Sequence, residues 1–144
     1  MLEDAIRLQV MKNLGSNEGS MLLEYIKKNK ENIFYFTRIP LYNMHIRMDV
    51  LCIDNIQMKF PISILGDLDK LRKHLRTLQG HSGKIIEIKE NLNFEALGQI
   101  IADIYYFPQE YPNIPITQYS ILCRYDDDCI EKVCSRHGIS VIKL

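Results

Sequence analysis

The sequence predicts a single α/β domain in which a mixed β-sheet is flanked by helices on both faces. The chain has 144 residues, the length of one domain, and we expect that domain to span residues 1–144. Hydrophobic residues make up 47% of the chain and charged residues 25%, which is typical of a protein that folds around a core. Segments with the alternation of strands take turns with segments of helical spacing, and this order favours a sheet covered by helices.

Two helical patterns open the chain. An amphipathic pattern in the first dozen residues stops near Gly15, where glycine and the cap-forming residues after it end one helix and begin another. The second helix is expected over about Glu18–Asn29. Helical spacing places Glu18 on the same side as Leu22 and Ile26, which is an unusual position for an acid.

Two strands are expected next. The β-branched and aromatic run Ile33–Arg38 ends at a proline turn, and Met44–Asp54 alternates as a strand does. Alternation in the second strand predicts one face formed by Arg47, Asp49, Leu51 and Ile53 and another formed by Ile46, Met48, Val50 and Cys52. Asp49 therefore lies in the middle of a strand between apolar neighbours.

The rest of the chain continues the alternation of helices and strands. The expected elements are a short strand within residues 56–64, an inserted helix at about 65–80 between the second and third core strands, a strand at Lys84–Lys89, a helix at Phe94–Phe107, a strand at Ile116–Cys123, a helix at Asp126–His137 and a strand at Ile139–Leu144. The aromatic residues at 105–107 end a helix, and core packing is favoured over base stacking there.

The segment Glu87-Ile88-Lys89 is the sharpest chemical signal. Residues two apart in a strand project to the same face, so a carboxylate lies beside an ammonium. Phosphodiester cleavage needs a divalent cation held by carboxylates, an activated water and positive charge near the phosphate. Asp49 and Glu87 can hold the cation, while Lys89 can act on the water and the phosphate. Surface strands also alternate Glu and Lys, but an aspartate strand and an acidic helix before this segment and a helix after it favour function.

With these motifs the chain resembles the PD-(D/E)xK, or restriction-endonuclease-like, nuclease superfamily over about residues 15–143. The N-terminal part is similar to archaeal Holliday-junction resolvases and the later helix to RecB-like nucleases. The resemblance is carried by Gly15-Ser16-Asn17-Glu18, Phe36–Pro40, Arg47–Leu51, Lys84–Lys89 and Leu97–Ala102. Two positions differ from the family pattern. Met48 replaces the name-giving proline, and Asp103 stands four residues after Gln99, where RecB-like members have tyrosine.

The resemblance implies a Mg²⁺ or Mn²⁺ site and a role for each motif residue. Its implied ligands are Asp49, Glu87 and the carbonyl of Ile88, with Glu18 helping directly or through water. Glu24 is the rival helical acid. Lys89 would orient or deprotonate the attacking water, and Gln99 would contact Lys89 or the DNA backbone.

The expected function is that of a metal-dependent DNA nuclease that hydrolyses phosphodiester bonds, and structure-specific cleavage and a homodimer are both compatible with the resemblance. The alternative is a protein of nuclease fold that binds nucleic acid or a protein partner without cutting. Eighteen basic residues balance eighteen acidic ones, so nucleic-acid binding has to rest on local sites. The chain shows neither a secretory signal pattern nor a long apolar run, so we expect a cytoplasmic protein without a membrane partner.

Overall fold

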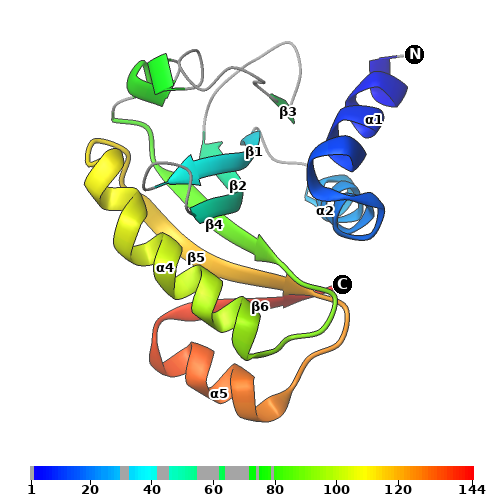
Figure 1. The fold of residues 1–144 in the computed structure, drawn as a ribbon, viewed down its shortest axis with the longest axis vertical. Coiled ribbons are helices and arrows are strands. Elements are labelled where there is room, and N and C mark those ends of the chain that lie inside the picture. The colour runs from blue at the N-terminus through cyan, green and yellow to red at the C-terminus, as the bar shows by residue number, and fades with distance from the viewer. Residues whose placement is uncertain are drawn as a thin grey trace.

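The computed structural model describes residues 2–29, 33–41, 46–54, 62–63, 72–73, 75–78 and 80–144. Within these residues a six-stranded mixed sheet runs in the order β3-β1-β2-β4-β5-β6 (Figure 1). The strands are β1 (Ile33–Leu41), β2 (Ile46–Asp54), β3 (Ile62–Ser63), β4 (Gly83–Ile88), β5 (Ile116–Cys123) and β6 (Ile139–Lys143). The helices are α1 (Leu2–Leu14), α2 (Ser16–Lys28), α4 (Phe94–Glu110) and α5 (Asp128–Arg136). The predicted α/β architecture with a mixed sheet is confirmed.

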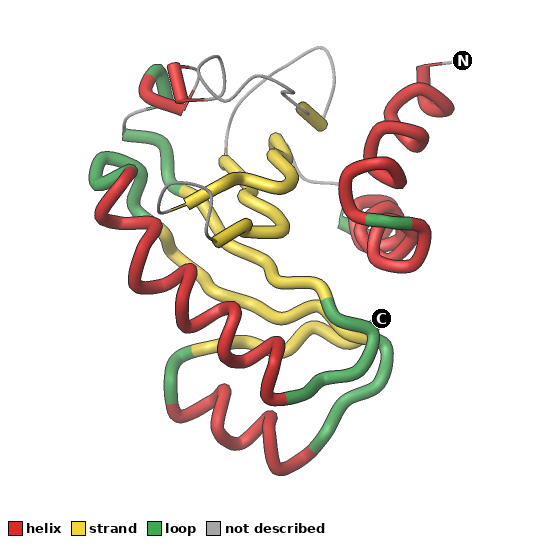
Figure 2. Tube along the Cα trace, viewed as in Figure 1, coloured by secondary structure: helices red, strands yellow, loops and turns green. Residues whose placement is uncertain are grey.

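Strand direction changes from one side of the sheet to the other. Strands β1, β2 and β4 are antiparallel neighbours, whereas β4, β5 and β6 run parallel. Parallel neighbours need a crossover between them, and α4 and α5 provide these crossovers on one face of the sheet (Figure 2). The carboxyl ends of β4 and β5 therefore lie side by side, and their following loops are joined by a hydrogen bond from Leu92 N–H to the carbonyl of Tyr125 (2.8 Å).

Alternation along the central strands fills two hydrophobic clusters, one on each face of the sheet. The cluster under α4 and α5 includes Leu51, Ile53, Ile85, Ile100, Phe107, Ile121 and Ile130. The cluster under α1 and α2 includes Val10, Met21, Leu22, Val50, Cys52, Ile86 and Ile88. The separation of Leu51 and Ile53 from Val50 and Cys52 follows the predicted alternation.

Met48 does not follow that alternation. It was expected beside Val50 and Cys52, but it packs in the cluster under α4 and α5, as does the partly buried Ile46. Met48 changes face where β2 runs beside Arg38. The φ of Arg38 is 57°, which interrupts the extended backbone conformation of β1. The expected face assignment is therefore wrong for the first residues of β2.

Several predicted boundaries differ from the structure or lie outside its described residues. Strand β4 ends at Ile88 rather than Lys89, although the N–H of Lys89 still donates to the carbonyl of Leu122 at 2.9 Å. The first residues of the predicted strand at 44–54 and most of the segments at 56–64 and 65–80 are outside the described residues. Of the expected insert, residues 72–73 and 75–76 are helical. None of the described helices combines the length and apolar character needed to cross a membrane.

Candidate active site

Asp49 lies in a cross-strand row between Arg38 and Glu87. The residues on either side of Arg38 pair with those on either side of Asp49, so these two residues face each other across β1 and β2. The pairing of Val50 with Ile86, continued by one residue, places Asp49 across from Glu87. Directly opposed side chains on neighbouring strands project to the same face. The two predicted metal-binding carboxylates are therefore neighbours in the middle of the sheet.

The regular backbone hydrogen bonding between β2 and β4 stops at this row. The N–H of Ile88 donates to Oδ2 of Asp49 at 3.0 Å, so the Asp49 side chain takes the place of a backbone acceptor. The other oxygen, Oδ1, lies 3.9 Å from Nη1 of Arg38. Asp49 is 5% exposed and Glu87 is 3% exposed. The Asp49 carboxyl is thus fixed in a buried position by contacts from both neighbouring strands.

Arg38 has a left-handed backbone conformation in the middle of β1, with φ = 57°. This region is unfavourable for a residue with a side chain, at a cost of about 1–3 kcal/mol, and such strain concentrates at functional sites. It occurs at the position directly across from Asp49. The conformation sets the guanidinium of Arg38 beside the carboxyl cluster instead of leaving Arg38 in the regular ladder.

Asp103 adds a third buried carboxyl that the sequence analysis did not select. It is 1% exposed and lies in the buried stripe of α4 with Ala96, Ile100 and Phe107. The Glu87 carboxyl is within hydrogen-bonding reach of both Asp49 and Asp103. The only signal for Asp103 in the sequence was its phase on the helix, because an acid there falls among the residues that face the sheet.

Burial favours the protonated form of these carboxyls. Burial, and then the negative charge of Asp49, raises the pKa of Glu87 to about 11. The same two causes raise the pKa of Asp103 to about 8. Burial also raises the pKa of Asp49, against the opposing effect of the Ile88 N–H. Near neutral pH, Glu87 is therefore a neutral acid that can donate a hydrogen bond to Asp49.

Within the described ranges, two carboxyl oxygens of the cluster have no hydrogen-bond donor. Glu87 Oε2 and Asp103 Oδ2 are buried, and neither has an N–H, hydroxyl or other ordinary hydrogen-bond partner among the described residues. Buried carboxylate oxygens without a donor are costly unless a proton or a cation satisfies them. The cluster therefore contains two buried carboxyl oxygens that are free to accept a proton or bind a cation.

Of the two helical acids considered from the sequence, Glu18 faces the cluster. Burial and the negative charge of Asp49 raise the pKa of Glu18, so it lies within electrostatic reach of Asp49. Glu24 instead pairs with Arg124 at 2.9 Å and Lys28 at 3.5 Å, and these contacts lower its pKa. Gly15, with φ = 87°, separates α1 from α2 and sets where the helix carrying Glu18 begins.

Lys89 lies at the rim of the cluster. Its Nζ is 3.2 Å from Oε2 of Glu95 in the first turn of α4, and its positive charge acts on both Asp49 and Glu18. Gln99, which was expected to contact Lys89 or DNA, is exposed on α4, so Glu95 contacts Lys89 in its place. The structure therefore groups Asp49, Glu87, Glu18 and Lys89 but leaves Gln99 on the outside of its helix.

The donor chemistry of the cluster fits a hard divalent cation. In the described ranges, no three His, Cys, Asp or Glu side chains already have the arrangement of a formed metal site. The carboxyls of Asp49, Glu87 and Asp103 nevertheless supply oxygen ligands, the kind that Mg²⁺ and Mn²⁺ prefer. A strand residue directs its N–H and C=O to the same side, so Ile88 also points its carbonyl toward Asp49. Loss of the shared protons would leave this donor set free for a cation.

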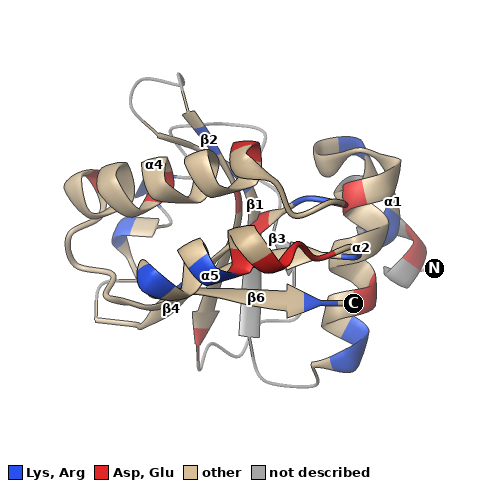
Figure 3. Cartoon of the chain, turned by 90° about the horizontal axis from the view of Figure 1, so that it is seen from below, with Lys and Arg blue, Asp and Glu red and all other residues tan. Residues whose placement is uncertain are grey.

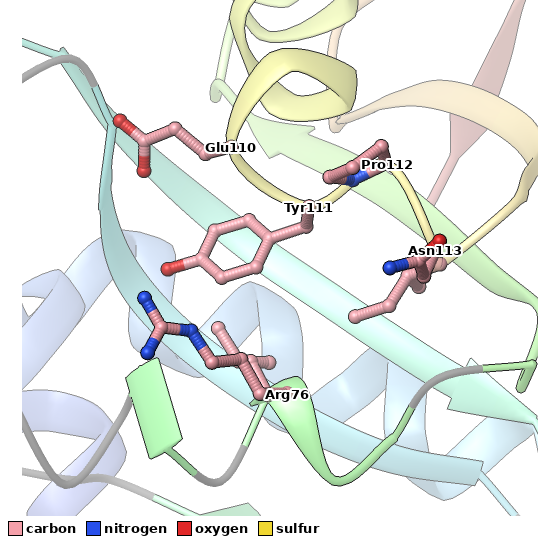
Figure 4. Close-up of a pocket in the computed structure, with 7 residues that line it drawn as sticks. Arg76, Glu110, Tyr111, Pro112 and Asn113 are labelled. Atoms are coloured by element: carbon pink, nitrogen blue, oxygen red, sulfur yellow. The ribbon is translucent and has the colours of Figure 1, made fainter.

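A separate hollow lies at the far end of α4. Its volume is about 210 Å³, and it is lined by Arg72, Arg76, Glu110 and Tyr111. Figure 4 shows an adjoining pocket, which shares Arg76, Glu110 and Tyr111 with this hollow and is also lined by Pro112 and Asn113; the Tyr111 hydroxyl points toward the guanidinium of Arg76. None of the predicted site residues lines this hollow, so it is distinct from the carboxyl cluster.

Comparisons of the chain with protein-family models, with curated proteins and with solved structures found no match. The interpretation of the site rests on its own geometry: three buried carboxyls, a fourth acid nearby, a lysine at the rim and a strained arginine opposite. Buried acids with strongly shifted pKa values and a specific charged neighbour are typical of functional sites.

Proposed function

We propose that this protein is a metal-dependent nuclease of restriction-endonuclease-like fold that hydrolyses phosphodiester bonds in DNA. The observation that carries the proposal is the opposition of Asp49 and Glu87 on adjacent central strands, both buried, with Lys89 two residues beyond Glu87. Two acids buried face to face would repel each other once both are ionised, and the single positive charge of Arg38, 3.9 Å from Asp49, does not balance two carboxylates. A divalent cation is the charge that would compensate them.

In the proposed site Asp49, Glu87 and the carbonyl of Ile88 hold the cation, and Asp103 is added to the ligands that the sequence suggested. A bound Mg²⁺ or Mn²⁺ supplies positive charge for the phosphate and lowers the pKa of water. The Ile88 N–H keeps the Asp49 carboxyl oriented, because it already donates to Oδ2. Glu18, which is within electrostatic reach of Asp49, would contribute through a water molecule.

Lys89 acts on the reacting atoms in this proposal. Its ammonium is held by Glu95 at the rim, so it can orient the attacking water and the phosphate together. The water oxygen forms a bond to phosphorus while the bond from phosphorus to one sugar oxygen breaks. The attacking water gives up one proton to solvent and the departing oxygen takes one up, so the products are a phosphate monoester and a free hydroxyl. Arg38 and Lys89 provide the positive charges that face the developing negative charge.

The direct test incubates the protein with linear, circular and four-way-junction DNA in the presence of Mg²⁺, Mn²⁺ or a chelator. Cutting that requires the cation is expected, and cutting of circular DNA would identify an endonuclease. The variants Asp49→Asn and Glu87→Gln should be inactive. Glu24→Gln is the matched control, because Glu24 lies on α2 with its partners outside the cluster.

Cutting that persists with a chelator, or at full rate in Asp49→Asn, would remove the cluster from the mechanism. Absence of cutting on every substrate would contradict the nuclease proposal. In that case a gel-shift measurement with the same DNA samples would decide whether the protein binds nucleic acid without cleaving it.

A further inference from the structure

Helix α4 carries large apolar side chains on its outward side as well as on its buried side. Its charged residues are Glu95, Asp103 and Glu110, and Asp103 is buried. On the outside Phe94 is 70% exposed, Tyr105 63% and Ile101 42%. Large apolar side chains gathered on an exposed helix side often mark an interaction surface. The outward side of α4 therefore has the character of a surface that another molecule covers.

The neighbouring helix α5 shows the ordinary pattern for the same face of the molecule. Its exposed residues include Asp128, Glu131, Lys132 and Arg136. Figure 3 shows blue and red along α5, while α4 is mostly tan. The apolar exterior is thus a property of α4 and not of this whole side of the protein.

Four uncharged exposed residues of α4 form one stripe, and the exposed polar residues Glu95, Gln99 and Gln109 lie beside it. Phe94, Gly98, Ile101 and Tyr105 follow one another at intervals of four, three and four residues, so they share one side of the helix. We call these four residues the outer stripe. A Cβ placed on Gly98 would meet nothing within 4 Å, so Gly98 forms a notch that opens outward between larger side chains.

We propose that the outer stripe is a homodimer interface, in which α4 packs antiparallel against α4 of a second copy. In a two-fold pair, each contact is repeated with the partners exchanged, so contacting residues are centred on one point of the helix. Phe94 and Tyr105 are centred on the same point as Gly98 and Ile101. Each Phe94 ring therefore meets the partner's Tyr105, and each Ile101 enters the notch at the partner's Gly98.

Charge and area both favour a second copy as the occupant. The outer stripe carries no charge, so like faces meet without repulsion, whereas a nucleic acid would need cationic side chains there. The exposed parts of its three large side chains amount to roughly 350 Å², taking about 200 Å² for a whole aromatic side chain. A standard homodimer needs on the order of 500 Å² of apolar surface from each partner. The outer stripe supplies most of that apolar centre.

The test measures the mass of the full chain by analytical ultracentrifugation across the micromolar range, without metal or DNA. The wild-type protein is expected to be a dimer. Gly98→Leu fills the notch that receives Ile101, and should raise the dissociation constant at least about tenfold. A Cβ at this position meets nothing within 4 Å and the substitution removes a helix-interior glycine, so the monomer should fold at least as stably. Urea denaturation checks this.

Tyr105→Glu is a second variant, which should also yield monomers because it buries two charges in the interface. Lys132→Leu on the exposed side of α5 is the control and should leave the mass unchanged. A wild-type monomer, or a dimer whose dissociation constant is unchanged by Gly98→Leu, would overturn the proposal. Loss of DNA binding in the outer-stripe variants of a monomeric protein would assign the surface to nucleic acid instead. These outcomes do not depend on whether the protein is a nuclease.

Discussion

Replacing Glu87 by glutamine should stabilise the metal-free protein near neutral pH while abolishing cleavage. The reason is that the folded protein keeps the Glu87 carboxyl protonated at a pH where the unfolded chain releases the proton. Glu87 has a pKa of about 11 in the folded protein against an ordinary value of 4.5, mainly because of burial. Below the lower value the carboxyl is protonated in both states and has no effect on the pH dependence. Above it the unfolded chain releases the proton and the folded chain retains it, so stability falls as pH rises.

The size of the effect follows from that difference. Each pH unit between the two pKa values costs about 1.4 kcal/mol, so the two and a half units from 4.5 to neutrality set a ceiling of about 3.5 kcal/mol. Asp49 and Asp103 share protons with Glu87, and this coupling lowers the expected gain to about 1–3 kcal/mol. Glutamine is neutral in both states, and its amide N–H can still donate to Asp49. The Glu87→Gln variant therefore avoids the cost without leaving a cavity.

The assay is urea denaturation followed by circular dichroism, with a chelator present, near pH 4 and near neutrality. The two proteins should be equally stable in acid, and the Glu87→Gln variant should be more stable near neutrality. Glu24→Gln is the control, because the pKa of the half-buried Glu24 is lowered by Arg124 and its loss should bring no gain. Equal stability of wild type and Glu87→Gln at both pH values, or a loss near neutrality, would refute the description of Glu87 as a buried neutral acid.

Three further substitutions separate the roles of the other site residues. Asp49→Asn should lose both Mn²⁺ binding and cleavage while keeping or raising stability, as calorimetry, a cleavage assay and urea denaturation would show. Lys89→Ala should keep or improve Mn²⁺ affinity, because it removes a repelling charge, while turnover falls by orders of magnitude; joint loss of both would make Lys89 a structural residue. Arg38→Gly should raise stability by about 0.5–1 kcal/mol, since glycine adopts φ = 57° freely and the 3.9 Å ion pair is partly exposed; a lower urea midpoint would show that the ion pair dominates.

The elements and the central acid pair could be predicted from the sequence because both depend on local spacing. Alternation placed Asp49 inside a strand, and the Glu-x-Lys segment placed Glu87 and Lys89 on one face of another. Glu18 was selected because it shares a side with apolar residues of its helix. The same reasoning applied to α4 would have selected Asp103, which lies three residues after the buried Ile100. The family motif instead indicated Gln99, which is exposed.

Other features could not be predicted because no local pattern encodes them. Nothing in the residues around Arg38 indicates a left-handed conformation, which depends on contacts from the neighbouring strand. The shift of Met48 to the other cluster follows from that irregularity. The pairing of Lys89 with Glu95 depends on how the loop after β4 brings the first turn of α4 back over the strand.

A calorimetric titration of the wild-type protein with Mn²⁺ near neutral pH, in two buffers of different ionisation enthalpy, tests the central claim most directly. Because Glu87 and Asp103 hold their protons there, a cation that binds their carboxyls must displace at least one of them. We predict binding of Mn²⁺ with proton release, seen as a heat that depends on the buffer, and no binding in Asp49→Asn. Absence of Mn²⁺ binding to the folded wild-type protein, or binding whose heat is the same in both buffers, would contradict a cation site in the carboxyl cluster.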